Sequence, residues 1–134
     1  MSKPVTKGAH HIGLVVAQLE ETAGFFTGLL GWQEVHRNEE YPAIFVSDGS
    51  IMVTLWAARE TPALPFNKNR NIGLHHVAFG VETEADLNSL YTRLAENGIR
   101  IEFAPEPLGQ GPAKHMMCYE PGGIRVEFIW PGTT

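Results

Sequence analysis

The stretch His10-His11-Ile12-Gly13-Leu14-Val15-Val16 recurs as His75-His76-Val77-Ala78-Phe79-Gly80-Val81, 65 residues further along the chain. Both copies begin with a pair of histidines and continue in the alternating manner of a β-strand. A repeat of this length in a chain of 134 residues indicates two related halves.

Two further segments match in the same order. Residues 31–35 match 98–102 at an offset of 67, and residues 48–54 match 121–127 at an offset of 73. The growing offset places insertions in the loops of the second half. Three ordered matches make a chance similarity untenable and indicate two copies of one structural unit.

Each half has the same order of predicted elements. In the first half, a strand over 11–16 precedes a helix over 19–30 with one apolar stripe, which Gly31 ends. Strands follow near 32–37, 43–47 and 51–57. The second half repeats this order with a strand over 74–81, a helix over 84–96 and strands near 99–103, 115–119 and 124–130. The chain is expected to be one domain over 1–134, made of module one (8–57), a linker (58–73) and module two (74–131).

The composition excludes several classes of protein. The chain is 43% hydrophobic and 19% charged, which is typical of a globular domain. Ten Lys and Arg against fifteen Asp and Glu leave a net charge of -5, so nucleic acid is not an expected partner. Neither a membrane span nor a signal peptide is predicted. The single Cys118 suits a reducing compartment, and a cytoplasmic location is expected.

Three side chains on one predicted face suggest a metal site. Alternation places His11, His76 and Glu127 together on the face opposite the apolar one. Two imidazoles and one carboxylate suit divalent Fe, Mn, Ni or Zn and leave positions open for water or substrate. The alternative is structural: a histidine pair without a ligand, and Glu127 in a salt bridge with an Arg such as Arg125.

These residues resemble the vicinal oxygen chelate superfamily, which includes glyoxalase I, bleomycin-resistance proteins and extradiol dioxygenases. The likeness covers about 8–131 and rests on four short motifs. They are His11-Ile12, Phe25-Phe26-x3-Leu30-Gly31, His76-Val77, and Tyr119-Glu120-Pro121-Gly122-Gly123 leading to Glu127. The resemblance implies an α+β fold, with two βαβββ modules forming a cupped eight-stranded mixed sheet with two long helices.

The resemblance also implies metal ligands at His11, Thr54, His76 and Glu127, and Thr54 departs from the family pattern. A neutral hydroxyl is a poor ligand and a poor base where glyoxalases have a carboxylate. The remaining three ligands resemble the sites of extradiol dioxygenases, although Met117 stands where those enzymes have an active-site Tyr. His115 and Tyr119 share a strand face with Met117 and are the candidate acid or base residues. The alternative for His115 is a solvent-exposed residue at a strand end.

The leading hypothesis is a metal-dependent enzyme, a dioxygenase-like oxidoreductase or a lyase or transferase, acting on a small, oxygen-chelating, hydrophobic or aromatic substrate. Its substrate pocket is expected to include Met52, Thr54, Trp56 and Arg125. One alternative is a metal-free drug- or ligand-binding protein of the bleomycin-resistance type, and another is a domain kept for assembly alone. Sheet edges that need covering favour a homodimer.

Overall fold

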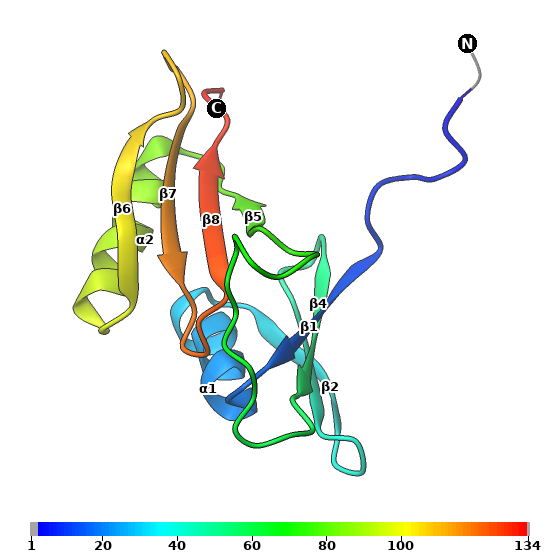
Figure 1. Cartoon of the computed structure of the whole chain (residues 1–134). Coiled ribbons are helices and arrows are strands. Elements are labelled where there is room, and N and C mark those ends of the chain that lie inside the picture. Colours follow the sequence, from blue (N-terminus) through cyan, green and yellow to red (C-terminus); the bar gives the residue numbers. More distant parts are fainter. Residues whose placement is uncertain (1–2, 134) are drawn as a thin grey trace. The chain divides into compact units, whose positions relative to one another are not determined.

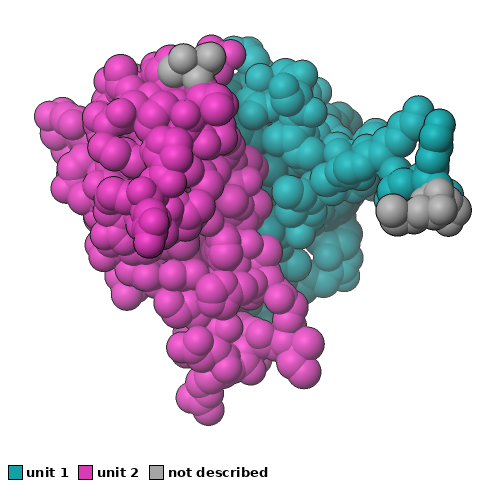
Figure 2. Space-filling model, turned by 90° about the horizontal axis from the view of Figure 1, so that it is seen from above, with its two compact units in different colours: residues 1–61 teal, residues 62–134 magenta. Residues whose placement is uncertain are grey.

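The computed structural model describes residues 3–133, and the chain divides into two compact units, 1–61 and 62–134 (Figure 2). Each unit contains one four-stranded mixed sheet and one helical segment (Figure 1). The predicted α+β fold class with two βαβββ modules is therefore confirmed. The eight strands form two four-stranded sheets, one in each unit. The boundary between the units, after Thr61, falls inside the predicted linker over 58–73.

Unit 1 follows the predicted order of elements. Strand β1 (His11–Val16) pairs in parallel with β4 (Met52–Ala57), which pairs antiparallel with β3 (Ala43–Ser47). Strand β2 (Gln33–Asn38) forms the outer edge beside β3. The parallel β1–β4 pair requires a long connection between its strands, which the helix and the β2–β3 hairpin supply.

The predicted helix over 19–30 consists of two parts. The α-helix α1 (Leu19–Gly24) continues as a π-helical turn, η1 (Phe25–Leu29). The wider turn is seen in the hydrogen bond from the Leu30 amide to the Phe25 carbonyl, at 3.2 Å, which spans five residues. The bulge brings the ring of Phe26 against those of Phe25 and Trp32, with centroids 5.4 Å and 4.9 Å away.

The apolar face of the unit 1 sheet packs against α1, which contacts β3 and β4. Its members share one face because they are register partners: Ile12 with Val53 and Leu14 with Leu55. Val53 and Leu55 are fully buried, whereas Val15 on the opposite face is exposed. The predicted assignment of the two strand faces is correct in this unit.

Unit 2 repeats the arrangement with the sheet order β5-β8-β7-β6. Its elements are β5 (Val77–Gly80), α2 (Glu84–Glu96), β6 (Arg100–Pro107), β7 (Lys114–Tyr119) and β8 (Arg125–Trp130). The bounds of α2 match the predicted helix. It begins where the hydroxyl of Thr83 accepts a 3.0 Å hydrogen bond from the Asp86 amide, a standard N-cap.

Helix α2 covers one face of the unit 2 sheet and contacts β6, β7 and β8 (Figure 1). Leu87 and Leu94 are fully buried on the helix. On the sheet, Val126 and Phe128 are buried beside their register partners Val77 and Phe79. The other face of the sheet is consequently left to the polar residues of β7 and β8.

Two strand boundaries in unit 2 differ from the prediction. Strand β5 begins at Val77, where its pairing with β8 begins, so His75 and His76 precede the strand. Strand β6 extends to Pro107, beyond the predicted end at 103. Prolines fit in β6 because it is the edge strand, on which some amides have no ladder partner. Within residues 3–133, no helix is long and apolar enough to cross a membrane.

Candidate functional site

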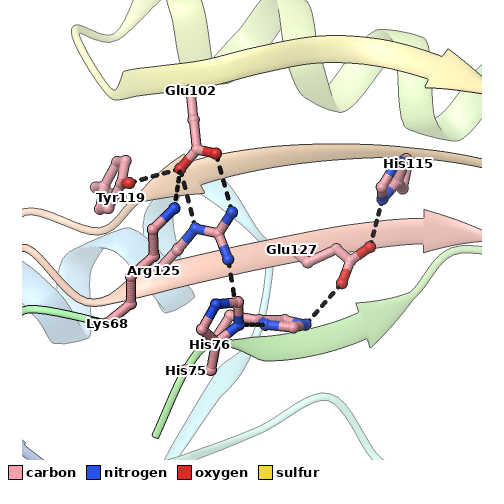
Figure 3. Close-up of polar contacts among 8 residues, drawn as sticks. All are labelled: Lys68, His75, His76, Glu102, His115, Tyr119, Arg125 and Glu127. Carbon is pink, nitrogen blue, oxygen red and sulfur yellow. Dashed lines mark hydrogen bonds and ion pairs between the residues drawn. The ribbon is translucent and has the colours of Figure 1, made fainter. Parts of the chain in front are cut away.

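The carboxylate of Glu127 lies between two imidazoles on the polar face of the unit 2 sheet (Figure 3). Its Oε1 is 3.0 Å from Nε2 of His76, and its Oε2 is 2.5 Å from Nδ1 of His115. Glu127 is 8% exposed, and its register partners are Ala78 on β5 and Met117 on β7. The small side chain of Ala78 leaves room for the carboxylate to reach His76.

The contacts of His75 determine which nitrogen of His76 carries a proton. Nδ1 of His75 is 2.8 Å from Nδ1 of His76 and 3.4 Å from Nη1 of Arg125. A guanidinium nitrogen can only donate, so the contact with Arg125 favours Nδ1 of His75 as an acceptor and Nδ1–H of His76 as the donor to it. Desolvation, followed by the charge of Arg125, lowers the pKa of His75, which agrees with a neutral, accepting ring.

This arrangement gives Nε2 of His76 a free lone pair directed at Glu127 when the ring is neutral. Two electron-rich atoms 3.0 Å apart attract each other only if a positive charge lies between them, either a proton or a metal ion. A metal-binding histidine ordinarily donates its other ring N–H to an acceptor, as His76 does to His75. The chemistry of this donor set therefore fits a divalent ion at Nε2 of His76 and Oε1 of Glu127.

His115 contacts the second oxygen of Glu127 and does not converge with His76 on one point. Within residues 3–133, no three His, Cys, Asp or Glu side chains have the arrangement of ligands around one ion. His115 is held by Glu127 and by the ring of Phe103, whose centroid is 4.9 Å away, and its side chain is mostly buried. It is not the solvent-exposed strand-end residue of the alternative interpretation.

A second polar cluster adjoins the first through Arg125 (Figure 3). Both oxygens of Glu102 accept from the guanidinium of Arg125, each at 2.9 Å, and Oε1 also accepts from the hydroxyl of Tyr119 at 2.5 Å. The hydrogen bonds from Arg125 are the main cause that lowers the pKa of Glu102 to about 2. The pKa of Tyr119 is raised, mainly by its hydrogen bond to Glu102, so the phenol stays protonated.

The structure thus assigns Arg125 a different partner from the one considered in the sequence. Arg125 pairs with Glu102, and Glu127 is left to the two histidines. The alternative interpretation of Glu127 as the salt-bridge partner of Arg125 is therefore wrong. The reason is the register of β6 against β7, which shifts between Ile101 and Phe103 and brings Glu102 to Tyr119, the register partner of Arg125.

Stability at acidic pH should report on the Glu102–Arg125 pair. Because the folded-state pKa of Glu102, about 2, lies below its ordinary value of 4.5, its charge stabilises the fold above pH 4.5, and this contribution disappears as the pH falls toward 2. We expect Arg125→Met to lower the free energy of unfolding at pH 7 by about 1.5–3 kcal/mol. The difference from wild type should shrink between pH 4.5 and 2, as measured by urea unfolding. A difference independent of pH, or an equal effect of the exposed Arg70→Met, would contradict this assignment.

The predicted site residues of unit 1 lie together on one face of its sheet. His11 pairs in register with Met52, and Gly13 pairs with Thr54. The hydroxyl of Thr54 accepts a 2.9 Å hydrogen bond from Nε1 of Trp56. A Cβ on Gly13 would lie 3.2 Å from the Thr54 hydroxyl oxygen, so glycine at this position gives Thr54 its space. His11 is exposed, with its Nδ1 2.9 Å from Nδ1 of His10.

Trp56 belongs to an aromatic wall on this face. Its ring lies 5.2 Å from that of Tyr41 and 5.6 Å from that of Phe45, measured between centroids. Met52 and Trp56 are both partly exposed. Unit 1 therefore presents an apolar aromatic surface on the sheet face that carries His11 and Met52.

Sequence reasoning missed Glu102, Lys68 and the role of His75. Lys68 Nζ is 3.8 Å from Oε1 of Glu102, and it comes from the predicted linker. His75 precedes strand β5 and contacts both His76 and Arg125. Glu102 lies on the edge strand β6, with β7 between it and Arg125 on β8.

Comparisons with known proteins place these features in a family. The family model for the Glyoxalase/Bleomycin resistance protein/Dioxygenase superfamily matches residues 8–128. The chain is 26% identical over 127 residues to the protein YqjT of Bacillus subtilis (strain 168), covering 91% of this chain and 98% of that one. It is 31% identical over 96 residues to the catechol-2,3-dioxygenase of the same organism, covering 69% of this chain but only 33% of that enzyme.

The fold also has a close match among solved structures. The glyoxylase/bleomycin resistance protein/dioxygenase domain from Frankia sp. EAN1pec superposes with a TM-score of 0.82 at 24% identity, covering 94% of this chain and 93% of that one. The match in fold agrees with the repeated βαβββ order, and the family model spans both histidine pairs and Glu127. The chain belongs to the Glyoxalase/Bleomycin resistance protein/Dioxygenase superfamily.

Proposed function

We propose that this protein is a metal-dependent enzyme that acts on a small, oxygen-chelating substrate with a hydrophobic or aromatic part. The observation that carries the proposal is the 3.0 Å approach of Nε2 of His76 to Oε1 of Glu127, two potential ligand atoms that either a metal ion or a proton would bridge. His11, the repeat equivalent of His76, is the third proposed ligand. The ion is Fe, Mn, Ni or Zn, and when bound it would polarise the substrate oxygens it chelates.

The other residues have roles that follow from their contacts. His75 and Arg125 keep Nδ1 of His76 engaged, which turns Nε2 toward the ion. His115 holds the second oxygen of Glu127. Of the two candidate acid or base residues, His115 and Tyr119, it is the one that contacts Glu127. Tyr119 is engaged with Glu102, so its first role is to position that carboxylate. Trp56 and Met52 would contact the apolar part of the substrate.

The dioxygenase-like chemistry is supported by the matched catechol-2,3-dioxygenase and by the proposed set of three ligands. Three protein ligands leave about three positions on a six-coordinate ion, enough for two substrate oxygens and dioxygen. Such a site favours a diol, a hydroxy-ketone or an enediolate as the chelating group.

Elemental analysis tests the proposal directly. Protein purified without chelators should contain about one divalent ion per chain. Protein without metal that also fails to take up added Fe, Mn, Ni or Zn would contradict the proposal and favour a ligand-binding protein of the bleomycin-resistance type. Oxygen uptake with a catechol, measured on the metal-loaded protein, then separates the dioxygenase reaction from other reactions of the superfamily.

Thr54 should not be a metal ligand. Its hydroxyl accepts from Trp56 at 2.9 Å and approaches the Ile12 carbonyl at 3.5 Å, and the side chain is buried. We expect Thr54→Ala to change metal affinity by less than about tenfold, or 1.4 kcal/mol, in isothermal titration. The hemithioacetal of methylglyoxal and glutathione should not be turned over, because the glyoxalase base is missing at this position. A large loss of metal in Thr54→Ala would show that the hydroxyl binds the ion.

We also propose that the protein is a homodimer. Strand β2 is an edge strand on which all six residues are exposed, including Val35. Unpaired strand edges with apolar side chains are commonly covered by closed two-fold assembly. Light scattering at micromolar concentration should therefore give a particle of twice 14.8 kDa. A particle of 14.8 kDa would contradict the proposal.

A further inference from the structure

Unit 2 contains a cavity of about 370 Å³ that the proposed metal site does not use. Residues 65–69, which precede β5, form one wall. Arg100 at the start of β6, Tyr119 at the end of β7, and Gly122 and Gly123 of the β7–β8 turn form the rest. The lining therefore combines two cationic side chains, Lys68 and Arg100, with side-chain amides at Asn67 and Asn69.

Arg100 is held in place by an aromatic ring. Its guanidinium lies over the ring of Tyr119, 4.2 Å from the centroid. Among residues 3–133, no carboxylate pairs with it. A guanidinium that lies over a ring and has no carboxylate partner keeps N–H groups available, and these match the geometry of a carboxylate or a phosphate.

The charges around the cavity do not cancel. The charge of the Glu102 carboxylate is neutralised by Arg125, which donates two hydrogen bonds to it. Nζ of Lys68 is 3.8 Å from Oε1 of Glu102, beyond hydrogen-bonding distance. Glu120, beside the turn, is buried and accepts from the amides of Gly122 and Ile124. Three cations, Lys68, Arg100 and Arg125, against two nearby carboxylates, Glu102 and Glu120, leave this region with an excess of one positive charge, although the whole chain has a net charge of -5. Such a local reversal favours an anionic ligand.

We propose that this cavity binds the anionic group, a carboxylate or a phosphate, of a small ligand, through Arg100 and Lys68. Tyr119 is the register partner of Arg125, which is two residues before Glu127 on β8. Arg100 is two strands away from Arg125, or about 10 Å, and Arg125 is about 7 Å from Glu127 along the strand, so a molecule that spans about 12 Å can reach both places. The inference extends the proposed function by naming its substrate class, a chelating molecule with an anionic end. The identification of the substrate class rests on the proposed function, whereas the anion site itself does not.

The test uses NMR of the ¹⁵N-labelled full chain in EDTA, so that its result is independent of any metal. Inorganic phosphate and acetate are titrated separately, each against potassium chloride of equal ionic strength, because free charges are screened by salt. The expected result is a saturable shift of the amides of Gly122, Gly123 and Asn69 with at least one of the two anions. The better anion distinguishes a phosphate site from a carboxylate site.

Two variants and a matched control assign the site to its side chains. Arg100→Ala and Lys68→Ala should each weaken the binding by at least fivefold. Arg59→Ala is the control, because Arg59 also stacks on a tyrosine, 4.0 Å from the centroid of Tyr41, but lies in unit 1. It should leave the binding within twofold of wild type. Absence of a saturable shift with both anions would overturn the proposal, as would equal weakening by Arg100→Ala and Arg59→Ala. Either result leaves the metal proposal untouched, since that one is decided by metal content.

Discussion

Glu127→Ala is expected to abolish stoichiometric binding of a divalent ion, with a loss of affinity of more than about 100-fold. Loss of a residue that only supports a metal ligand lowers metal affinity by about 10- to 100-fold, and loss of the ligand itself should lower it further. His76→Ala should have an effect of the same size, because Nε2 of His76 and Oε1 of Glu127 face the same point. The measurement is metal content after dialysis, together with isothermal titration of the metal-free protein.

The control for this experiment is Glu96→Ala, which removes an equal charge from the exposed end of α2. It should retain the metal of the wild-type protein. Circular dichroism checks that each variant keeps its secondary structure. Equal metal in wild type and in both site variants would show that the ion, if present, is bound elsewhere.

His115→Phe separates a ligand-positioning role from a ligand role. If His115 acts by holding the second oxygen of Glu127, its loss should lower metal affinity by about 10- to 100-fold without abolishing binding. A loss of metal affinity as large as that of Glu127→Ala would show that His115 is a ligand. An unchanged metal affinity would leave His115 only the proposed role of acid or base.

The largest effect on stability is expected for Phe26→Ala, which should lower the free energy of unfolding by about 3–5 kcal/mol. Phe26 is 0% exposed and contacts the rings of Phe25 and Trp32 edge to face. The substitution removes a large apolar surface and two aromatic contacts, and it leaves a cavity beneath the π-helical turn. For a domain whose total stability is about 5–15 kcal/mol, this is a large fraction.

Urea unfolding measures the change, with Val35→Ala as the matched control. Val35 is an apolar residue of the same unit but is 54% exposed, so its truncation should change stability by less than about 0.5 kcal/mol. A change of less than 1 kcal/mol for Phe26→Ala would mean that the cavity collapses or that the aromatic contacts contribute little.

The order of elements was readable from the sequence because it depends on local properties. Strand alternation in the two histidine stretches and the helical pattern over 84–96 act over a few residues, and α2 has the predicted bounds. The faces of the strands also followed, since the alternation of side chains is fixed by the pleat. That placed Glu127 on the polar face of its sheet, where the structure has it.

What the sequence did not predict depends on contacts between distant residues. The π-helical turn at Phe25–Leu29 goes together with the packing of Phe26 against Trp32, a tertiary contact that no local propensity encodes. The pairing of Arg125 with Glu102 depends on the bulged register of β6 against β7, because the irregularity lies beside Glu102. Register shifts of this kind are not visible in the pattern of apolar residues.

The sequence by itself determined the doubled βαβββ order and the polar strand faces, and it singled out His76 and Glu127, because local propensity and the pleat are enough to specify them. The family resemblance added His115 as a candidate. Only the tertiary structure decided how those candidates are used. It brought His75 and Arg125 behind His76, placed His115 on the second oxygen of Glu127, and gathered Lys68 and Arg100 around a cavity. These arrangements join residues up to 50 positions apart, and their geometry arises only when strands pair and the preceding loop packs on them.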